Sequence, residues 1–265
     1  MKKSVLLVLT VALSMLALTG CAGKATSENQ LDKIKKDGKI IFAMEGAWAP
    51  WTFHDESGDL VGFDTEVGKA IAAKLGVEAE FVEGEWDGLF AGLDSGRYDA
   101  IINGVEITSE REEKYDFTTP YAYIKTALVV ADTNVDINSF EDLQGKKTSN
   151  SLGSTYADLA EQYGATVENV DTLSETIDMV LSGRVDATLN AEDSFYDYLK
   201  EHPDAPIKIV ALTEDSSHVS IPLVKGEDNA ALKAAIDKAI AELAADGTLT
   251  ELSNKYFGGD ISKEQ

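Results

Sequence analysis

The sequence has 265 residues, with 47 acidic side chains against 23 basic ones, and its formal net charge is −24 at pH 7. This charge argues against a nucleic-acid-binding protein, because that binding depends on lysine and arginine side chains that neutralise phosphates. The hydrophobic content of 44% is enough for a sizeable core, and the single cysteine excludes an internal disulfide.

The first twenty residues have the pattern of an export signal. Lys2 and Lys3 precede an apolar stretch over residues 4–18, which is shorter than the roughly 20 residues that a transmembrane helix needs. The sequence LTGC at residues 18–21 resembles a bacterial lipobox, in which the cysteine is acylated and becomes the first mature residue. We therefore expect a signal peptide at residues 1–20, a lipid on Cys21 and a tether over residues 21–37. The protein would be exported and anchored to the cell membrane by this lipid, facing outward or into the periplasm.

The rest of the chain alternates between strand and helix patterns. Short apolar runs bounded by turn residues predict strands, and apolar residues three or four positions apart predict helices. The first run predicts strands over residues 39–43, 77–82, 98–102 and 123–131, and helices over 64–75, 86–93 and 108–114. The second run predicts strands over 145–149, 167–170, 185–189, 207–212 and 219–224, and helices over 154–163, 174–181, 191–200, 230–245 and 249–256.

This alternation predicts an α/β fold with mostly parallel sheets, and its two runs predict two lobes. The segment LDSGRYDA at residues 93–100 is similar to LSGRVDA at residues 181–187. Each places a Gly-Arg turn between a helix and a strand, as two similarly built lobes would do. The same similarity could also arise by coincidence from turn chemistry that many proteins share.

Several short motifs follow one another in a specific order. They are GFD at 62–64, WDGL at 86–89, ITSER at 107–111, FTTPY at 117–121, DLQGK at 142–146, GRVDA at 183–187, DGTL at 246–249 and YFG at 256–258. Together they resemble the polar amino-acid branch of the bacterial solute-binding proteins that serve ABC importers. The resemblance covers the chain from about residue 39 to about residue 262.

The resemblance implies a periplasmic-binding-protein type II fold, with two Rossmann-like lobes joined by two hinge strands and the ligand in the cleft between them. Lobe 1 would comprise residues 38–129 plus 222–262, and lobe 2 residues 130–221. The chain would cross between the lobes near residues 129–133 and again near 217–223. The protein would be a monomer without catalytic activity, cofactor or metal, and its partners would be a free amino acid and an ABC permease in the membrane.

An amino-acid ligand needs a partner for its carboxylate, and the resemblance assigns this role to Arg111. A guanidinium matches two carboxylate oxygens with two parallel hydrogen bonds. Ser154 and Thr155 stand at the predicted start of a helix, where amide groups and the helix dipole favour an anion. From the residues alone, a surface arginine is the favoured interpretation of Arg111, because four charged residues surround it, and the resemblance reverses this. Ser154 could be a plain helix cap, a role that is compatible with binding an anion.

The resemblance also assigns a clamp for the ligand side chain to Trp48 and Trp86. Indole rings suit aliphatic stems, sulfur and cations. We interpret Trp51 as a core residue.

The ammonium partner departs from the family pattern. Many relatives carry an aspartate where this chain has Ala191, so another carboxylate should take over. Glu106 is our candidate. It lies two residues before Thr108, a further candidate site residue at a position where relatives carry a hydroxyl residue that touches the same ammonium, and we expect Glu106 to replace both groups. The rival hypothesis is that Glu106 reads a cationic ligand side chain, with help from Glu45. Asn103 and Gly104 would line the same wall.

The identity of the ligand stays open at this point. The segment SNSLGSTY at residues 149–156, together with Asn190, is most similar to the cystine-binding branch, which we favour. The additional acids Glu45 and Glu106 suggest lysine or arginine instead. A dehydratase of the same fold is a further alternative, with Glu106 as acid or base, although no nucleophile motif lies near His54, His202 or His218.

Overall fold

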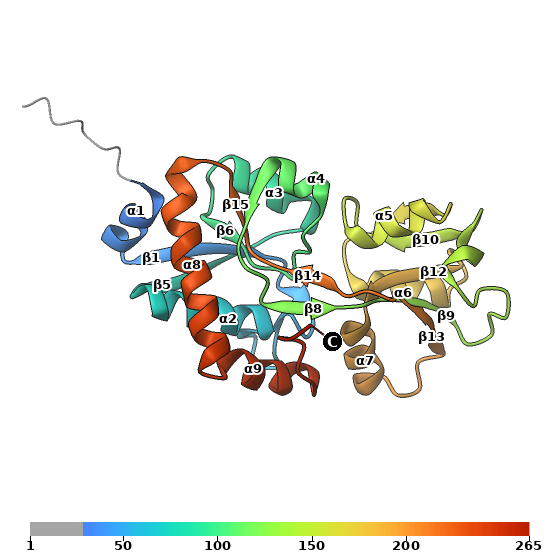
Figure 1. Ribbon diagram of the computed structural model, residues 1–265. Coiled ribbons are helices and arrows are strands. Elements are labelled where there is room, and N and C mark those ends of the chain that lie inside the picture. Colours follow the sequence, from blue (N-terminus) through green and yellow to red (C-terminus); the bar gives the residue numbers. More distant parts are fainter. Residues whose placement is uncertain (1–28, 265) are drawn as a thin grey trace, which may run out of the picture.

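The computed structural model describes residues 29–264 and divides them into two lobes connected by extended strands (Figure 1). The predicted signal peptide and the lipid on Cys21 lie outside the described residues. Within residues 29–264, no helix combines the length and apolar character needed to cross a membrane.

The segment assigned to the tether contains an ordered helix, α1 (Gln30–Asp37). Asn29 caps this helix by accepting a hydrogen bond from the Asp32 amide at 3.0 Å, and Gly38 ends it in the left-handed conformation. Ile34 is buried in the core of lobe 1. A cap, the buried Ile34 and the partly buried Leu31, which packs against the same core, therefore order this short helix.

Lobe 1 is built on a parallel sheet in the order β5-β1-β6. Its strands are β1 (Lys39–Met44), β5 (Glu78–Glu83) and β6 (Ala100–Ile101). The central strand β1 is fully buried at Phe42, Ala43 and Met44, as expected when helices cover both faces of a parallel sheet. The helices of this lobe are α1, α2 (Phe63–Leu75), α3 (Trp86–Asp94), α4 (Ser109–Lys114), α8 (Glu227–Ala245) and α9 (Thr248–Phe257).

A small antiparallel meander leads from the central strand into α2. It consists of β2 (Ala47–Trp48), β3 (Thr52–His54) and β4 (Leu60–Val61). Gly62 follows it with φ +126°, and a Cβ at this position would lie 2.2 Å from the Trp51 carbonyl oxygen. Only glycine fits such an approach, so the chain turns tightly around Trp51.

Asp64 lies inside the first turn of α2, because Gly62 is the capping residue. Its carboxylate is fully buried and accepts hydrogen bonds from the Tyr121 hydroxyl at 2.7 Å and from the Gly104 amide at 2.5 Å. This buried carboxylate fixes the backbone of Gly104, which is one of the candidate site residues.

Lobe 2 is built on a mixed sheet in the order β11-β10-β12-β9-β13. The first three strands are parallel to one another, and β9 and β13 are antiparallel to their neighbours. The strands are β9 (Thr126–Ala131), β10 (Lys147–Asn150), β11 (Thr166–Asn169), β12 (Ala187–Ala191) and β13 (Ile207–Leu212). The helices are η1 (Phe140–Leu143), α5 (Thr155–Gln162), α6 (Leu173–Leu181) and α7 (Glu192–Glu201).

The lobes are joined by paired strands that run side by side between them (Figure 1). The apolar run at 123–131 predicted one strand, but it divides at Lys125 into β8 (Ala122–Ile124) and β9. The strand β8 pairs with β14 (Ser217–Val219), whereas β9 pairs only within the sheet of lobe 2. The first crossing therefore lies near Lys125, earlier than the expected region at 129–133. On the lobe 1 side, β15 (Pro222–Val224) pairs with β7 (Tyr115–Phe117).

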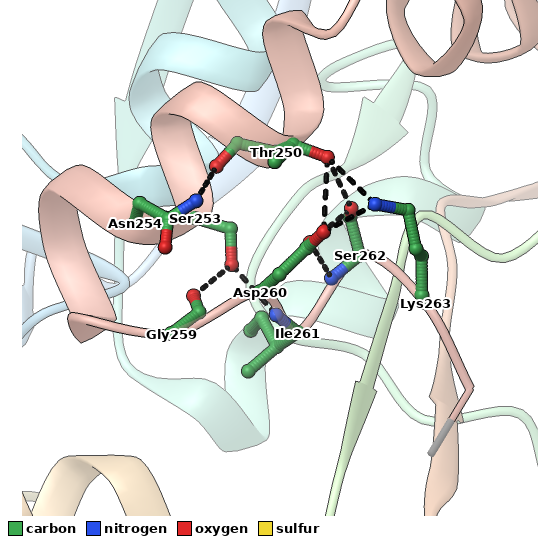
Figure 2. A network of polar contacts seen from close by, with 8 residues as sticks. All are labelled: Thr250, Ser253, Asn254, Gly259, Asp260, Ile261, Ser262 and Lys263. Carbon is green, nitrogen blue, oxygen red and sulfur yellow. Dashed lines mark hydrogen bonds and ion pairs between the residues drawn. The ribbon is translucent and has the colours of Figure 1, made fainter.

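The C-terminal residues return to this hinge after α9 (Figure 2). The Thr250 hydroxyl donates to Asp260 Oδ2 at 3.0 Å, and the Ser253 hydroxyl oxygen accepts from the Ile261 amide at 2.7 Å. The Ile261 carbonyl in turn accepts from the Tyr123 amide of β8 at 2.8 Å. The end of the chain thus ties α9 to one of the two hinge strands.

Candidate ligand-binding cleft

A cleft between the two lobes encloses about 570 Å³ of empty space, part of it open to solvent. Ten of the eleven predicted ligand-binding residues line it, and Thr108 is the exception. Lobe 1 supplies Glu45, Trp48, Trp86, Asn103, Gly104, Glu106 and Arg111, and lobe 2 supplies Ser154, Thr155 and Asn190.

Arg111 lies on α4 and reaches across the mouth of the cleft. Its guanidinium donates to the Glu106 carbonyl at 2.9 Å and to the Gly153 carbonyl of lobe 2 at 3.0 Å. The guanidinium carbon lies 5.2 Å from the centre of the Trp86 ring and 5.6 Å from that of Phe90. Burial lowers the pKa of Arg111, and the charge of Glu106 opposes this shift. Two carbonyls and two aromatic rings therefore hold the guanidinium in one orientation.

Thr108 has a different role from the one expected. It does not line the cleft; its hydroxyl oxygen accepts a hydrogen bond from the Arg111 amide at 3.2 Å and caps α4. Thr108 acts on the site indirectly, because the helix that it caps carries Arg111.

The start of α5 faces Arg111 from lobe 2. Ser154 caps this helix, accepting a hydrogen bond from the Ala157 amide at 3.1 Å. The first amides of a helix have no partner within the helix and carry a partial positive charge. Together with the guanidinium, this helix start makes an electropositive corner that suits a carboxylate.

Glu106 lies beside this corner and is only 5% exposed. Its Oε1 atom accepts a hydrogen bond from the Thr155 hydroxyl at 2.8 Å, which connects the two lobes. Tyr156 stands next to it; burial, and then the charge of Glu106, raise the pKa of this tyrosine. Ala191 is fully buried at the end of β12 and offers no carboxylate here. A cationic group of a ligand would therefore meet Glu106.

Two indole rings form apolar walls of the cleft. Trp48 is stacked on Trp51 with ring centroids 5.4 Å apart and planes 15° apart, and Trp48 Nε1 donates to Asn190 Oδ1 at 3.2 Å. A Cβ at Gly104 would lie 2.6 Å from the Trp48 ring, so glycine is needed for this close approach. Trp51 is fully buried behind Trp48, as a core residue would be.

Glu45 adds a second acidic group to the cleft. Its Oε2 atom accepts a hydrogen bond from Asn103 Nδ2 at 2.6 Å, and Asn103 Oδ1 accepts from the Glu45 amide at 2.8 Å. Burial raises the pKa of Glu45 to about 7, against the smaller opposing effect of Asn103. The carboxyl group is thus poised to be neutral or charged near neutral pH.

Several residues of lobe 2 that were not predicted as ligand-binding residues also line the cleft, three of them within the segment SNSLGSTY at 149–156. They lie at the ends of β10 and β11 or at the starts of α5 and α6, and they include Asn150, Ser151, Tyr156, Asp171, Thr172, Leu173 and Thr176. Asn150 donates through Nδ2 to the Leu189 carbonyl at 2.6 Å. Its buried Oδ1 atom has no hydrogen-bond partner among residues 29–264, so it is available to accept a hydrogen bond from a group in the cleft. The same part of the chain contains no cluster of side chains suited to a metal ion.

Comparisons with known proteins agree with this geometry. Residues 40–259 match the family of bacterial extracellular solute-binding proteins, family 3. The L-cystine-binding protein TcyA of Bacillus subtilis is 36% identical over 270 residues, which cover 98% of this chain and 100% of TcyA. An ancestral arginine-binding protein bound to arginine is similar in structure with a TM-score of 0.78 and 40% identity, over 83% of this chain and 99% of that one. The L-cystine solute receptor of Neisseria gonorrhoeae in its unliganded open conformation is also 40% identical, but its TM-score is 0.59, over 88% of this chain and 98% of that one.

The relative position of the lobes corresponds to a closed form. At equal sequence identity, the ligand-bound relative is more similar in structure than the open one. Hydrogen bonds also join side chains of the two lobes directly, at Thr155 with Glu106 and at Trp48 with Asn190. These relatives are binding proteins, two for cystine and one for arginine.

Proposed function

The chain belongs to family 3 of the bacterial extracellular solute-binding proteins, and from this premise we propose that it captures a free polar amino acid, with cystine favoured, for import by an ABC permease. One observation carries the proposal. Arg111, the start of α5 and the Glu106 carboxylate converge in one cleft, between indole walls and across two hinged lobes. Such a set complements the carboxylate and the ammonium of one amino-acid head.

Each part of the proposed ligand has a partner among these residues. The ligand carboxylate would lie between the Arg111 guanidinium and the first amides of α5. Its ammonium would pair with Glu106, and its side chain would extend along Trp48 and Trp86. Because these groups come from both lobes, the ligand stabilises the closed form by contacts that the open form cannot make.

Cystine is favoured because relatives at 36% and 40% identity are cystine-binding proteins. Lysine or arginine is the second candidate, and Glu45 is the observation that favours it. A cationic ligand side chain in the cleft could form an ion pair with the Glu45 carboxylate, which forms none among residues 29–264. The arginine-bound relative supports the same candidate.

Isothermal titration of the purified chain with the amino acids and cystine tests the proposal. We expect one ligand per chain, a dissociation constant of about 1 µM, near −8 kcal/mol, and recovery of the ligand unchanged. Absence of heat with every amino acid would falsify the proposal. Turnover of a ligand would instead support a dehydratase, although neither His54, His202 nor His218 lines the cleft.

We further propose that the mature protein is a monomer tethered to the membrane by lipid on Cys21. The lipobox-like sequence LTGC at residues 18–21 supports the anchor. Metabolic labelling with a palmitate analogue should mark the wild-type protein and leave a Cys21→Ala variant unmarked. Labelling of both would exclude this anchor.

A further inference from the structure

A second contact between the lobes lies behind the ligand cleft. Trp51 of lobe 1 donates through its indole Nε1 to Asp193 Oδ1 of lobe 2 at 3.3 Å. Trp51 is fully buried and Asp193 is 9% exposed. The ring of Trp51 is stacked on Trp48, whose own indole donates to Asn190 in lobe 2. The two stacked tryptophans of lobe 1 thus both bind lobe 2 where β12 ends and α7 begins, Trp48 at Asn190 and Trp51 at Asp193.

Asp193 is poorly suited to carry a charge in this position. Its Oδ1 atom also accepts from the Ser194 hydroxyl at 3.4 Å, but its Oδ2 atom is buried without a hydrogen-bond partner among residues 29–264. A buried carboxylate oxygen without a partner is costly, and much more so when the group is ionised. A proton on Oδ2 removes the charge and leaves Oδ1 free to accept from Trp51.

Among residues 29–264, no cation forms an ion pair with Asp193, and Lys125 instead attracts the neighbouring carboxylate of Glu192. Glu192 precedes it on α7, Asp64 faces it from α2, and the Tyr156 hydroxyl faces it from α5. Burial is the main reason why the pKa of Asp193 rises to about 7, and the charge of Glu192 adds to the rise. The hydrogen bonds from Trp51 and Ser194 oppose it.

We propose that Asp193 and Trp51 form a latch of the closed state, and that Asp193 takes up one proton from solvent when the lobes close. This inference rests on the proposed function, since closure is how the protein would hold its ligand. In the open state the Asp193 carboxylate meets water and is ionised. In the closed state it is a neutral acid that accepts the Trp51 N–H bond. Asp193 and Trp51 are positioning residues, because neither lines the ligand cleft.

The latch makes ligand binding depend on pH. The closed state binds the additional proton, so ligand affinity rises as the pH falls through about 7, and it levels off near the ordinary aspartate pKa of 3.8. One proton changes the affinity by up to about tenfold per pH unit, which gives about 30-fold tighter binding at pH 5.5 than at pH 8. At pH 6, ligand binding should take up about 0.9 proton at Asp193.

The matched experiment compares wild type with Asp193→Asn. Asparagine keeps an acceptor for Trp51 but carries no titrating charge. Titrations with L-cystine, or with L-arginine if cystine gives no heat, are run at pH 5.5, 6 and 8 in buffers of different ionisation heat. The difference in proton uptake between wild type and the variant gives the contribution of Asp193, because other acids such as Glu45 contribute in both proteins. Asp197→Asn, on the same helix and outside the latch, is the control and should keep the wild-type profile.

We expect the Asp193→Asn variant to lose the part of the pH dependence that Asp193 contributes, to keep the part due to Glu45 and other acids, and to bind at least as tightly as wild type at pH 8. Trp51→Phe, which keeps a ring and removes the N–H donor, should weaken binding about tenfold at pH 6. An Asp193→Asn variant with the pH profile and proton uptake of wild type would overturn the latch while leaving the proposed function intact. No heat with either ligand, in any of the proteins, would overturn both.

Discussion

Replacing Glu106 by glutamine tests the charge pairing at the heart of the cleft. Glutamine has nearly the same shape and retains a carbonyl oxygen. That oxygen can still accept the hydrogen bond from the Thr155 hydroxyl, which Glu106 Oε1 accepts at 2.8 Å. The contact of Arg111 with residue 106 is also retained, because the guanidinium binds the backbone carbonyl. The substitution therefore removes the negative charge and little else.

The expected loss follows from the burial of Glu106, which is 5% exposed. Two unit charges about 4 Å apart attract by about 4 kcal/mol at an effective dielectric constant of about 20. The amide dipole of glutamine recovers part of this, so we estimate a net loss of about 2–3 kcal/mol. Since about 1.4 kcal/mol corresponds to a tenfold change, ligand binding should weaken about 30- to 100-fold.

The assay is isothermal titration of the best ligand against both proteins at pH 7, with a thermal melt of each ligand-free protein. Glu110→Gln is the control, because Glu110 is 76% exposed on the neighbouring helix and undergoes the same chemical change. We expect this control to bind like wild type, and both variants to melt within a few degrees of it. A dissociation constant for Glu106→Gln within threefold of wild type would remove Glu106 as the ammonium partner.

Three other substitutions test neighbouring parts of the structure. Arg111→Lys replaces a two-pronged contact by a single point charge, so ligand binding should weaken about 10- to 100-fold in titrations; an unchanged affinity would separate Arg111 from the carboxylate. Gly104→Ala places a Cβ 2.6 Å from the Trp48 ring at φ +56°, and we expect at least tenfold weaker binding and a free energy of unfolding lower by about 1–3 kcal/mol. Burial raises the pKa of Asp64 to about 7 in the folded protein from an ordinary 3.8. Its contribution to the free energy of unfolding is thus full at low pH and is lost as the pH rises through about 7. Urea denaturation at pH 5.5 and 7.5 should show this decline in wild type and a smaller one in Asp64→Asn.

The fold could be predicted from the sequence more securely than its division into lobes. The alternation of strand and helix patterns, and the order of the motifs, predicted the α/β class that the family match confirms. The apolar run at 123–131 gave no sign that it divides at Lys125. An apolar pattern reports burial but not which strand will be the partner, and here β8 pairs with β14 while β9 joins another sheet. Pairing of this kind is fixed by contacts distant in the sequence.

Among the cleft residues of lobe 1, Trp86 and Arg111 stand in the ordered motifs, and the others were assigned through the family resemblance. Several residues of lobe 2 were not predicted as ligand-binding residues, although three of them lie in the segment SNSLGSTY at 149–156. A physical signal was nevertheless present for two of these. Asn150 ends β10, and Asp171 follows β11, at the carboxyl edge of parallel strands where ligands bind in α/β folds. Asp64 and Thr108 could not be placed in this way. Whether such a polar residue caps a helix or faces a site depends on the tertiary structure around it.

The charge state of Glu45 offers a way to distinguish the two candidate ligands that does not depend on the latch. Free cystine has no net charge near pH 7, whereas arginine has one positive charge. The pKa of Glu45 is raised to about 7 by burial, so the cleft becomes more negative as the pH rises through this value. The affinity for arginine should therefore increase relative to the affinity for cystine above pH 7, because an ionised Glu45 attracts the arginine side chain.

The quantity to measure is the ratio of the dissociation constants for arginine and cystine at pH 6 and pH 8. Both ligands close the lobes, so proton uptake at Asp193 affects both constants equally and cancels in the ratio. We expect this ratio to fall by up to about tenfold from pH 6 to pH 8, since one group titrates. The Glu45→Gln substitution should abolish the change. If the ratio does not change with pH, or if it changes equally in Glu45→Gln, then Glu45 does not face the ligand side chain. The choice between cystine and arginine would in that case fall to other residues that line the cleft, among them Glu106, Asn150 and Asp171.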